Sequence, residues 1–207
     1  MQKIDFFLGL KNKEIITLAG EKGFQKILFV KEIQDMNDFK SLKEQKDYDA
    51  CLLSVKNVNF LRRMIDKASN YFNYVLVLGL NDEINRAALK HKKVFGLVAP
   101  EFNRKEDFLN QRNSGLNHVL CKIAKETRKM IIFRFSDILN KKDRERAVLL
   151  GRIMQNLKLC RKYKVSCLLI NFSSSIQNIF HVKQLKIFEK ILLSRFRLDP
   201  QTYFKGG

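Results

Sequence analysis

Seven short, strongly apolar runs recur along the chain, and segments with helical periodicity separate them. A run such as YVLVLG at residues 74–79 is apolar on both faces, which is typical of a strand that is covered on both sides. Strands that alternate with helices form parallel β–α units. We therefore predict strands at residues 3–8, 24–30, 50–54, 74–79, 93–98, 130–135 and 166–171. We predict helices at residues 12–21, 57–68, 81–91, 114–127, 143–163 and 182–196.

Seven β–α units suit either an α/β barrel or an open doubly wound sheet, and their pattern alone does not separate these two folds. The chain has 207 residues and shows no internal repeat, low-complexity tract or linker, so we predict one domain over residues 1–197. The last ten residues, LDPQTYFKGG, contain a proline and a glycine pair. We predict that residues 198–207 form a frayed tail.

The net charge is +19, and the excess is unevenly distributed. Residues 1–100 hold 17 basic and 12 acidic side chains, whereas residues 101–207 hold 23 and 9. A basic half-chain favours a polyanionic partner such as nucleic acid, although a Lys-rich proteome would give a similar excess. The chain has no run of 18 apolar residues and no signal-peptide core near its start, so we expect a cytoplasmic protein without a membrane partner.

Cysteine and histidine give little support for metal or redox chemistry. The four cysteines form no C-x-x-C pair, so we expect them to be reduced, and most of them to be small buried residues. The three histidines, His91, His118 and His181, are widely spaced and have no neighbouring carboxylate cluster. We therefore predict no metal site. Motifs for nucleotide binding and for a hydrolase nucleophile are also absent from the sequence.

A long polar segment, EFNRKEDFLNQRNSGLN, follows the predicted strand at residues 93–98. In parallel α/β folds, β–α loops gather at the carboxyl end of the strands, where binding sites are built. Its guanidinium groups and amides suit phosphate oxygens, which predicts anion binding, whereas the alternative is a long structural loop. We expect its acids, Glu101, Glu106 and Asp107, to be solvated. The basic side chains in question are Arg104, Lys105 and Arg112.

Two of the predicted helices after this loop show clear polar and apolar faces. In the first, Ser114 is the expected N-cap and Gly115 allows another chain to approach closely, while His118 and Lys122 face outward. In the helix at 143–163 we expect a buried stripe made of Leu150, Ile153, Met154 and Leu157. The polar positions of that helix, which we place on its surface, include Arg152, Asn156 and Lys162.

Three consecutive stretches resemble the family of ribonuclease P protein component 3, the archaeal relative of the eukaryotic 30 kDa subunit. They are NSGLNHVLCKIAKE, MIIFRFSDIL and RERAVLLGRIMQNLKLCRKYKVSCLLINFSSS. The similarity is specific over residues 97–175, whereas residues 1–96 share only the strand–helix rhythm of the family. The resemblance implies an α/β barrel related to TIM barrels, with an irregular number of about seven parallel strands.

The resemblance also implies a function. Members of this family belong to a cytoplasmic ribonucleoprotein that removes the 5′ leader of precursor tRNA, and catalysis there belongs to the RNA subunit and its Mg²⁺. The protein contacts the ribonuclease P RNA and pairs with a small ferredoxin-like protein subunit. We therefore expect no catalytic residue, metal ligand or cofactor in this chain. The matched motifs carry Arg112, Ser114, Gly115, Asn117, His118, Arg146, Arg152, Asn156, Lys162, Tyr163, Ser173 and Ser174.

From the loop, the two helices and the resemblance we predict one set of RNA-binding residues. They are Arg104, Lys105, Arg112, Asn113, Ser114, Asn117, His118, Lys122, Arg146, Arg152, Asn156 and Lys162. Two other functions remain open, namely an accessory protein that binds other tRNA or rRNA and a metal-dependent phosphoesterase of barrel fold. The strand-end histidines of such phosphoesterases are absent here, which argues against the second.

The last predicted helix is apolar around most of its circumference, with Leu185, Ile187, Phe188, Ile191, Leu192, Leu193 and Phe196. A barrel helix needs only one buried stripe, so this pattern predicts a second apolar contact. The contact is made either by the tail of the domain or by another protein subunit.

Overall fold

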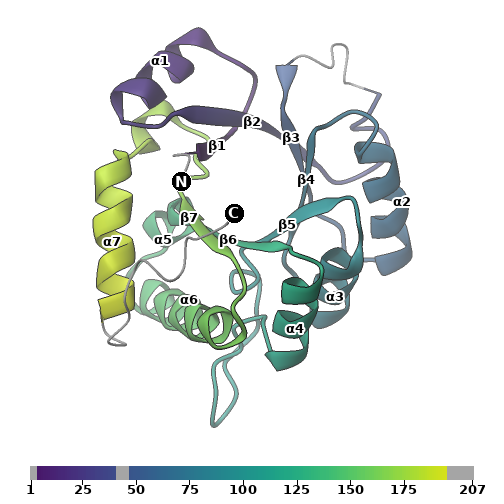
Figure 1. Cartoon of the computed structure of the whole chain (residues 1–207), viewed down its shortest axis with the longest axis vertical. Helices are drawn as coiled ribbons and strands as arrows, with labels where there is room; N and C mark the ends of the chain where they lie inside the picture. Colours follow the sequence, from purple (N-terminus) through teal and green to yellow (C-terminus); the bar gives the residue numbers. More distant parts are fainter. Residues whose placement is uncertain (1–3, 41–46, 195–207) are drawn as a thin grey trace.

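The computed structural model describes residues 4–40 and 47–194. Seven strands, all parallel, follow one another around a nearly closed barrel in the order in which they occur in the sequence (Figure 1). They are β1 (Ile4–Leu8), β2 (Lys26–Ile33), β3 (Ala50–Leu53), β4 (Tyr74–Leu78), β5 (Val94–Val98), β6 (Met130–Arg134) and β7 (Cys167–Ile170). The prediction of a TIM-like barrel with about seven parallel strands is confirmed, and an open doubly wound sheet is excluded because its strand order would reverse.

Helices cover the outside of this ring. They are α1 (Lys13–Glu21), α2 (Val58–Ala68), α3 (Asp82–Lys90), α4 (His118–Glu126), α5 (Phe135–Asn140), α6 (Asp143–Tyr163) and α7 (Val182–Ser194), with the 3₁₀ turn η2 at Ile176–Asn178. The six predicted helices are all present. The short helix α5 and the turn η2 were not predicted, because each is shorter than two full turns of helical periodicity. The predicted tail at 198–207 lies outside the described residues.

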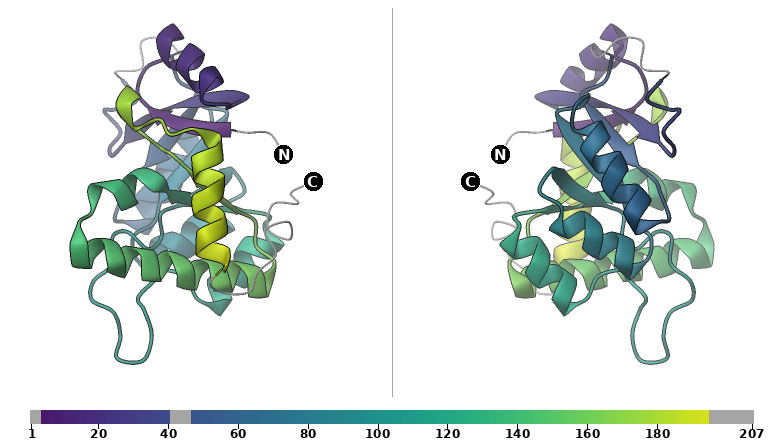
Figure 2. Two further views of the ribbon diagram at one scale, coloured as in Figure 1. Left: turned by 90° about the vertical axis from the view of Figure 1, so that its left-hand side faces the viewer. Right: turned by 90° about the vertical axis from the view of Figure 1, so that its right-hand side faces the viewer.

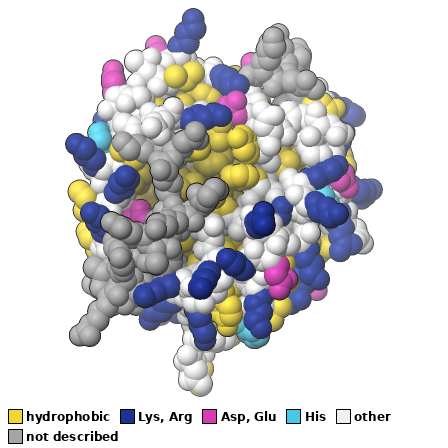
Figure 3. Space-filling model, viewed as in Figure 1, with side chains coloured by type: hydrophobic (Ala, Val, Ile, Leu, Met, Phe, Trp, Pro, Cys, Tyr) yellow, Lys and Arg dark blue, Asp and Glu magenta, His cyan; other side chains and the backbone are white. Residues whose placement is uncertain are grey.

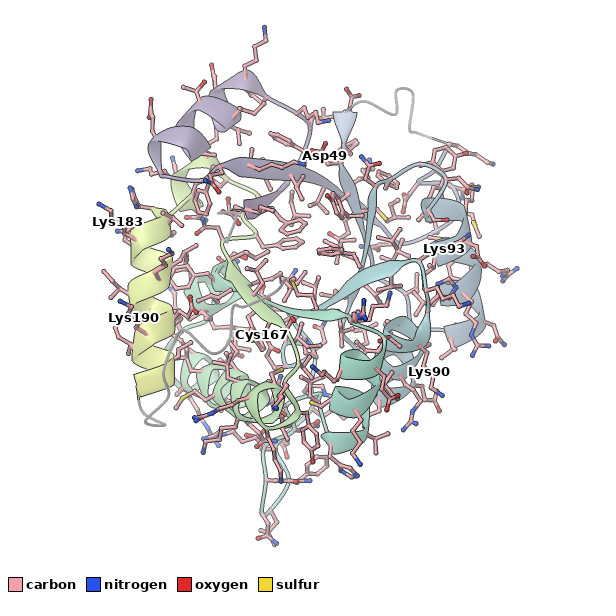
Figure 4. The ribbon with its side chains drawn as sticks, in the orientation of Figure 1. Asp49, Lys90, Lys93, Cys167, Lys183 and Lys190 are labelled. Carbon is pink, nitrogen blue, oxygen red and sulfur yellow. The ribbon has the colours of Figure 1, made fainter. Side chains whose placement is uncertain are left out.

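The strands are apolar on both faces because each face packs into a separate core. Inside the barrel lie Phe6, Leu28, Leu52, Leu76, Val98, Ile132, Ile170 and Phe172. Between the strands and the helices lies a larger cluster that includes Leu53, Leu61, Ile84, Leu97, Leu120, Ile131, Ile153 and Leu157. The four cysteines are free thiols and all are buried, as predicted. Cys167 starts β7, next to α6 in Figure 4.

A buried carboxylate joins the first and last strands of the barrel, which share only an isolated bridge between Phe7 and Ser173. Oδ1 of Asp5 accepts hydrogen bonds from the backbone N–H groups of Asn171 at 3.0 Å, Phe172 at 3.3 Å and Phe6 at 2.8 Å. The Asn171 side chain donates to Oδ2 of the same carboxylate. Burial raises the pKa of Asp5 to about 6, although these hydrogen bonds act in the opposite direction. Asp5 therefore replaces ladder hydrogen bonds at the seam.

Candidate functional site

The connection from β5 to α4, residues 99–117, leaves the barrel at the carboxyl end of the strands and extends away from it. The two side views in Figure 2 show it projecting beyond α6 as a narrow loop. We call residues 104–113 the projecting loop. Its position matches the prediction that a long β–α loop lies on the rim where parallel α/β folds build their sites.

The neck of the projecting loop is closed by a single carboxylate, Asp107. Its Oδ1 accepts from Nε of Arg152 at 2.8 Å and from the backbone N–H of Asn113 at 2.9 Å, while Oδ2 lies 3.2 Å from Nη1 of Arg112. Burial alone would raise the pKa of Asp107, but the hydrogen bonds from Arg152 and Asn113 hold it below its usual value. The two ends of the loop are therefore tied to each other and to α6.

Arg152 of α6 also binds the backbone of the projecting loop. Its Nη1 donates to the carbonyl oxygen of Arg104 at 3.3 Å, and its Nη2 donates to that of Lys105. Only 8% of its side chain is exposed. A guanidinium can serve a carboxylate and two carbonyl groups at once because its donors form a planar fork. Arg152 is therefore an internal brace of the loop.

Below the neck, Glu101, Ser114 and Asn156 form a buried polar cluster. Nδ2 of Asn156 donates to Oε2 of Glu101 at 3.1 Å and to the backbone carbonyl of Ser114 at 2.7 Å. Burial raises the pKa of Glu101 to about 8. The expectation that Glu101 is solvated is wrong, because the carboxyl lies under the loop against α6 and is only 1% exposed. Glu106 is exposed as expected, and Asp107 is paired.

The raised pKa of Glu101 predicts a pH-dependent stability. The folded protein holds this proton up to about pH 8, whereas the unfolded chain releases it near its ordinary value of 4.5. The contribution of protonated Glu101 to the free energy of unfolding is therefore complete below about pH 4.5, and it is lost as the pH rises to about 8. Glu101→Gln removes the titration, so its stability relative to wild type should rise by a few kcal/mol, on the order of 1.4 per pKa unit, between pH 5.5 and 8.5. Urea unfolding at both pH values measures this difference, and parallel profiles for the two proteins would contradict it.

The two arginines of the loop have different surroundings. Arg104 donates from Nη1 to the carbonyl oxygen of Leu80 at 2.8 Å and pairs with Asp82, and 11% of its side chain is exposed. Arg112 is 45% exposed, and its guanidinium lies against Gly151 of α6. A Cβ at position 151 would stand 2.4 Å from Cζ of Arg112, so a larger residue there would displace the guanidinium. Gln155 adds hydrogen bonds to the backbone N–H and carbonyl of Arg112 at 3.2 and 3.0 Å.

A basic cleft of about 780 Å³ lies between the projecting loop and the start of α6. Its cationic side chains come from both walls, with acids between them: Arg104, Lys105, Glu106 and Asp107 on one side and Lys141, Arg144, Glu145 and Arg152 on the other. Lys141 pairs with Glu145 at 3.1 Å, and Asp107 is paired within the neck. Lys105 and Arg144 are exposed, so the cleft can offer charge to an anion.

The carboxyl-terminal mouth of the barrel is closed by side chains. Arg134, at the end of β6, donates from Nε to Oδ2 of Asp137 at 2.6 Å. Its guanidinium lies over the rings of Phe102 and Phe172, with centroids at 5.3 and 5.7 Å, and Phe172 stacks on Phe6 inside the barrel. Burial raises the pKa of Asp137 despite this pairing. At this mouth, the features that remain open to a ligand are the projecting loop and the cleft.

Three of the predicted RNA-binding residues are not on the surface. The prediction that Arg152 and Asn156 occupy the surface of their helix is wrong, since they are 7% and 0% exposed and fix the loop from below. Ser114 is 2% exposed, and its hydroxyl accepts from Nε2 of Gln155 at 3.0 Å. The buried face of α6 includes Leu149, Ile153 and Leu157, whereas Leu150 and Met154, predicted to be buried, are half-buried.

The other predicted residues remain accessible to different extents. Lys105, Arg112, His118, Lys122, Arg146 and Lys162 are exposed, and Arg104, Asn113 and Asn117 are half-buried. The loop brings Arg104, Lys105, Arg112 and Asn113 together. Arg146 and Lys162 stand near opposite ends of α6, about 24 Å apart at 1.5 Å per residue. As RNA contacts, these residues stay predictions.

The predicted start of the helix after the loop is also corrected. The N-cap is Asn117, whose side chain accepts from the backbone N–H of Leu120 at 2.9 Å, and the helix begins at His118. Ser114 lies before the helix, because Gly115 has a φ of +80° and turns the chain there. A Cβ on Gly115 would stand 1.9 Å from the carbonyl oxygen of Pro100. The close approach at Gly115 is therefore made by Pro100 of the same chain, whereas the approach of another chain stays a prediction.

Several residues that shape the site were not singled out in the sequence. Gln155, Lys141 and Arg144 help to hold the loop or line its cleft, and Arg134 with Asp137 closes the mouth. The signal that could have identified the last pair is RFSD, in which an Arg at the end of a predicted strand is followed three residues later by an Asp. A glycine in the middle of a long helical pattern, Gly151, indicates a close approach in the same way.

Two classes of feature are missing from the part of the chain that the structure describes. Across residues 4–40 and 47–194, no group of His, Cys, Asp or Glu side chains is arranged to hold a metal ion. In the same residues, no helix has the length and apolar character needed to cross a membrane.

Comparison with known proteins supports the resemblance seen in the sequence. The chain is 30% identical over 140 residues to "Ribonuclease P protein component 3" of Methanococcus maripaludis, covering 68% of this chain and 56% of that relative. It is 32% identical over 138 residues to the protein of the same name from Methanocaldococcus jannaschii, covering 67% and 55%. The chain thus spans little more than half the length of the curated relatives it matches. No protein-family model matches it.

Solved structures agree with the sequence comparison. A chain in the cryo-EM structure of archaeal ribonuclease P with mature tRNA superposes with a TM-score of 0.73 at 27% identity. The superposition covers 92% of the present chain and 82% of that chain. A crystal structure of an uncharacterized protein superposes with a TM-score of 0.57 at 8% identity, which shows a shared fold alone.

Proposed function

Because this chain is a relative of ribonuclease P protein component 3 in both sequence and fold, we propose that it is a protein subunit of ribonuclease P. In this role it binds the ribonuclease P RNA and supports removal of the 5′ leader from precursor tRNA, in the cytoplasm. The observation that carries the proposal is the superposition of 92% of the chain on a chain of archaeal ribonuclease P with mature tRNA.

The distribution of charge supports an RNA partner. Figure 3 shows Lys and Arg side chains spread over the visible face, with few Asp or Glu side chains between them. Figure 4 shows Lys183 and Lys190 on the outer side of α7, and Lys90 and Lys93 on the far side of the barrel from them. Neutralising phosphates with such side chains releases counterions, which supplies affinity for any nucleic acid. Within this proposal, the cleft and the projecting loop are the surfaces where RNA binds.

Lys105→Ala and Arg112→Ala should weaken RNA binding without unfolding the protein. Both side chains are exposed, and the backbone of Arg112 stays bonded to Gln155 after the change, so stability should move by about 0.5–1 kcal/mol or less. Each lost phosphate contact should reduce the slope of log affinity against log salt by about 0.7–0.9. Filter binding of structured RNA at several salt concentrations measures the slope.

The matched control is Lys13→Ala, an exposed lysine on α1, at the opposite end of the molecule from the loop (Figure 1). It should leave the slope unchanged. Unchanged slopes for Lys105→Ala and Arg112→Ala would remove these residues from the interface.

The proposed division of labour leaves catalysis to the RNA subunit and its Mg²⁺. This chain would act by holding RNA in place through its cations, loop and cleft. Cleavage of precursor tRNA by a reconstituted complex of the RNA and the protein subunits tests this. Cleavage at limiting Mg²⁺ should fall when the chain is omitted and return when it is added. Equal cleavage with and without the chain would contradict the proposal.

The proposal includes a protein partner, the small ferredoxin-like subunit that the family resemblance implies. A groove of about 570 Å³ between α6 and α7 is the surface best suited to it, with Leu150, Met154, Phe188 and Leu192 among its lining residues. Ile187 of α7 is 57% exposed and lies one helical turn before Ile191, which lines the groove. Phe188 and Leu192 are unsuitable for a test of binding, because Phe188 packs on Phe135 with centroids at 5.0 Å and Leu192 is buried.

Ile187→Asp should therefore weaken pairing with that subunit while the barrel stays folded. A charge at an exposed position costs little stability, but it opposes burial in an apolar interface. Size-exclusion chromatography of the mixed subunits measures the pairing, and Lys186→Asp, an exposed neighbour on α7, controls for the change of charge. Co-elution of Ile187→Asp at the wild-type level would exclude this face.

Two alternative functions are distinguished by direct measurements. An accessory protein for other tRNA or rRNA would bind RNA but would not change precursor tRNA cleavage. A metal-dependent phosphoesterase would hold stoichiometric metal and hydrolyse a generic phosphodiester without an RNA subunit. Elemental content of the purified protein and hydrolysis of bis(p-nitrophenyl) phosphate decide the second case.

A further inference from the structure

The tip of the projecting loop carries two large apolar side chains that the fold does not use. Phe108 is 58% exposed and Leu109 is 99% exposed. Burying either one would be favourable by about 1.5–3 kcal/mol, so their exposure needs an explanation. Asn110 and Gln111 follow them and are exposed as well. The tip therefore combines an aromatic ring, a branched aliphatic group and two amides.

The tip is held at both ends rather than hanging from a loose linker. Asp107 immediately precedes it and accepts the backbone N–H of Asn113 at 2.9 Å, and Nδ2 of Asn113 donates to the carbonyl of Glu106 at 3.3 Å. Arg152 anchors this neck to α6 at 2.8 Å. Figure 2 shows the loop extending clear of the helices in both views. Such an arrangement reduces the entropy lost when the tip is ordered in a complex.

We propose that the loop tip contacts an unpaired nucleotide of RNA, with the ring of Phe108 stacked on the base and Leu109 packed beside it. This inference rests on the proposed function and names the contact that the loop makes within it. Aromatic side chains stack on bases of any sequence, because every base has a π-face. The amides of Asn110 and Gln111 can then donate to and accept from the exposed edge of the base.

The charges around the tip favour RNA over a protein as its partner. Lys105 and Arg112 are exposed on either side of it, within reach of the phosphates next to a stacked base. The carboxylate of Asp107 is paired with two guanidinium groups, so it repels a phosphate less than its formal charge suggests. The interior of a duplex offers no free base face to the ring, and the major groove of A-form RNA is too deep and narrow for side chains to read. An unpaired nucleotide in a loop, bulge or end offers both a free base face for the ring and neighbouring phosphates for Lys105 and Arg112.

A tryptophan probe tests the inference, because the chain contains no tryptophan. Phe108→Trp places a single indole at the tip, and stacking on a base should quench its fluorescence. The probes are a ten-nucleotide oligouridine and a long RNA duplex, compared at equal nucleotide concentration so that few terminal base-pair faces are present. We expect quenching by the single strand and little change with the duplex. Phe108→Ser should weaken single-strand binding by about 5- to 100-fold, whereas Phe108→Tyr should keep most of it.

Controls separate this contact from general charge effects. Phe108→Ser should leave the salt slope unchanged, since it removes no phosphate contact, and Ile16→Ser, 50% exposed on α1, should leave binding unchanged. Wild-type affinity in Phe108→Ser together with an unquenched Phe108→Trp would overturn the inference and leave the proposed function intact. So would a Phe108→Ser protein that binds RNA normally but loses another protein subunit. A wild-type protein that binds neither these probes nor structured RNA at low salt would contradict the proposed function itself.

Discussion

Replacing Asp5 with alanine is expected to lower the free energy of unfolding by about 3–5 kcal/mol, because several buried donors lose their acceptor at once. The carboxylate accepts three backbone N–H groups and the side-chain amide of Asn171 across the β1–β7 seam. For a domain of this size the melting temperature should fall by about 10 °C. Urea unfolding followed by circular dichroism measures the change.

Asp5→Asn is the matched variant for the seam. Its amide oxygen can still accept from the backbone of Asn171, but its amide nitrogen would face the donor on the Asn171 side chain. Its loss of stability should therefore be intermediate. Asp35→Ala, which removes an exposed carboxylate from the loop after β2, should cost much less. A melting temperature for Asp5→Ala within about 2 °C of wild type would show that the seam does not depend on this carboxylate.

Replacing Arg152 with methionine should cost about 2–4 kcal/mol and release the projecting loop. The change leaves Asp107 without its 2.8 Å partner and leaves the carbonyl groups of Arg104 and Lys105 without their donor. Trypsin should then cut after Arg104, Lys105 or Arg112 faster than it cuts the wild type, in which the closed neck should restrain the backbone at these sites. Mass spectrometry of limited digests identifies the cut sites.

Lys162→Met, an exposed change on the same helix, serves as the control. It should alter neither the melting temperature nor the tryptic cleavage within the projecting loop. RNA binding by Arg152→Met should weaken through the freed loop. A stable Arg152→Met protein with an intact loop and weakened binding would instead support the original prediction that Arg152 contacts RNA.

The strands of this barrel were predictable because each one packs on both sides. Val75, Leu76 and Val77 alternate between the outer and inner cores, so no polar residue interrupts the run. The parallel arrangement followed from the helices between such runs. The seam was not predictable, because Asp5 and Asn171 are 166 residues apart and neither residue type signals its partner.

The sequence predicted where the projecting loop lies, but it did not predict which of its polar partners are buried. The loop after β5 was expected at the rim and lies there, and its exposed cations Lys105 and Arg112 were among the predicted residues. Arg152 and Asn156 were placed on the wrong side of α6, since local periodicity assigns polar residues to the solvent. Their partners, Asp107 and Glu101, lie 45 and 55 residues away, so only the folded chain shows that both polar side chains are satisfied internally.

The identity of the RNA that accompanies this chain in cells tests its proposed role most directly. The tagged protein would be isolated from extract of cells that express it, and the co-purified RNA would be sequenced, with Lys105→Ala/Arg112→Ala as a matched sample. The account predicts strong enrichment of the ribonuclease P RNA with the wild type and less with the double variant. Recovery of ribosomal RNA without the ribonuclease P RNA would contradict it.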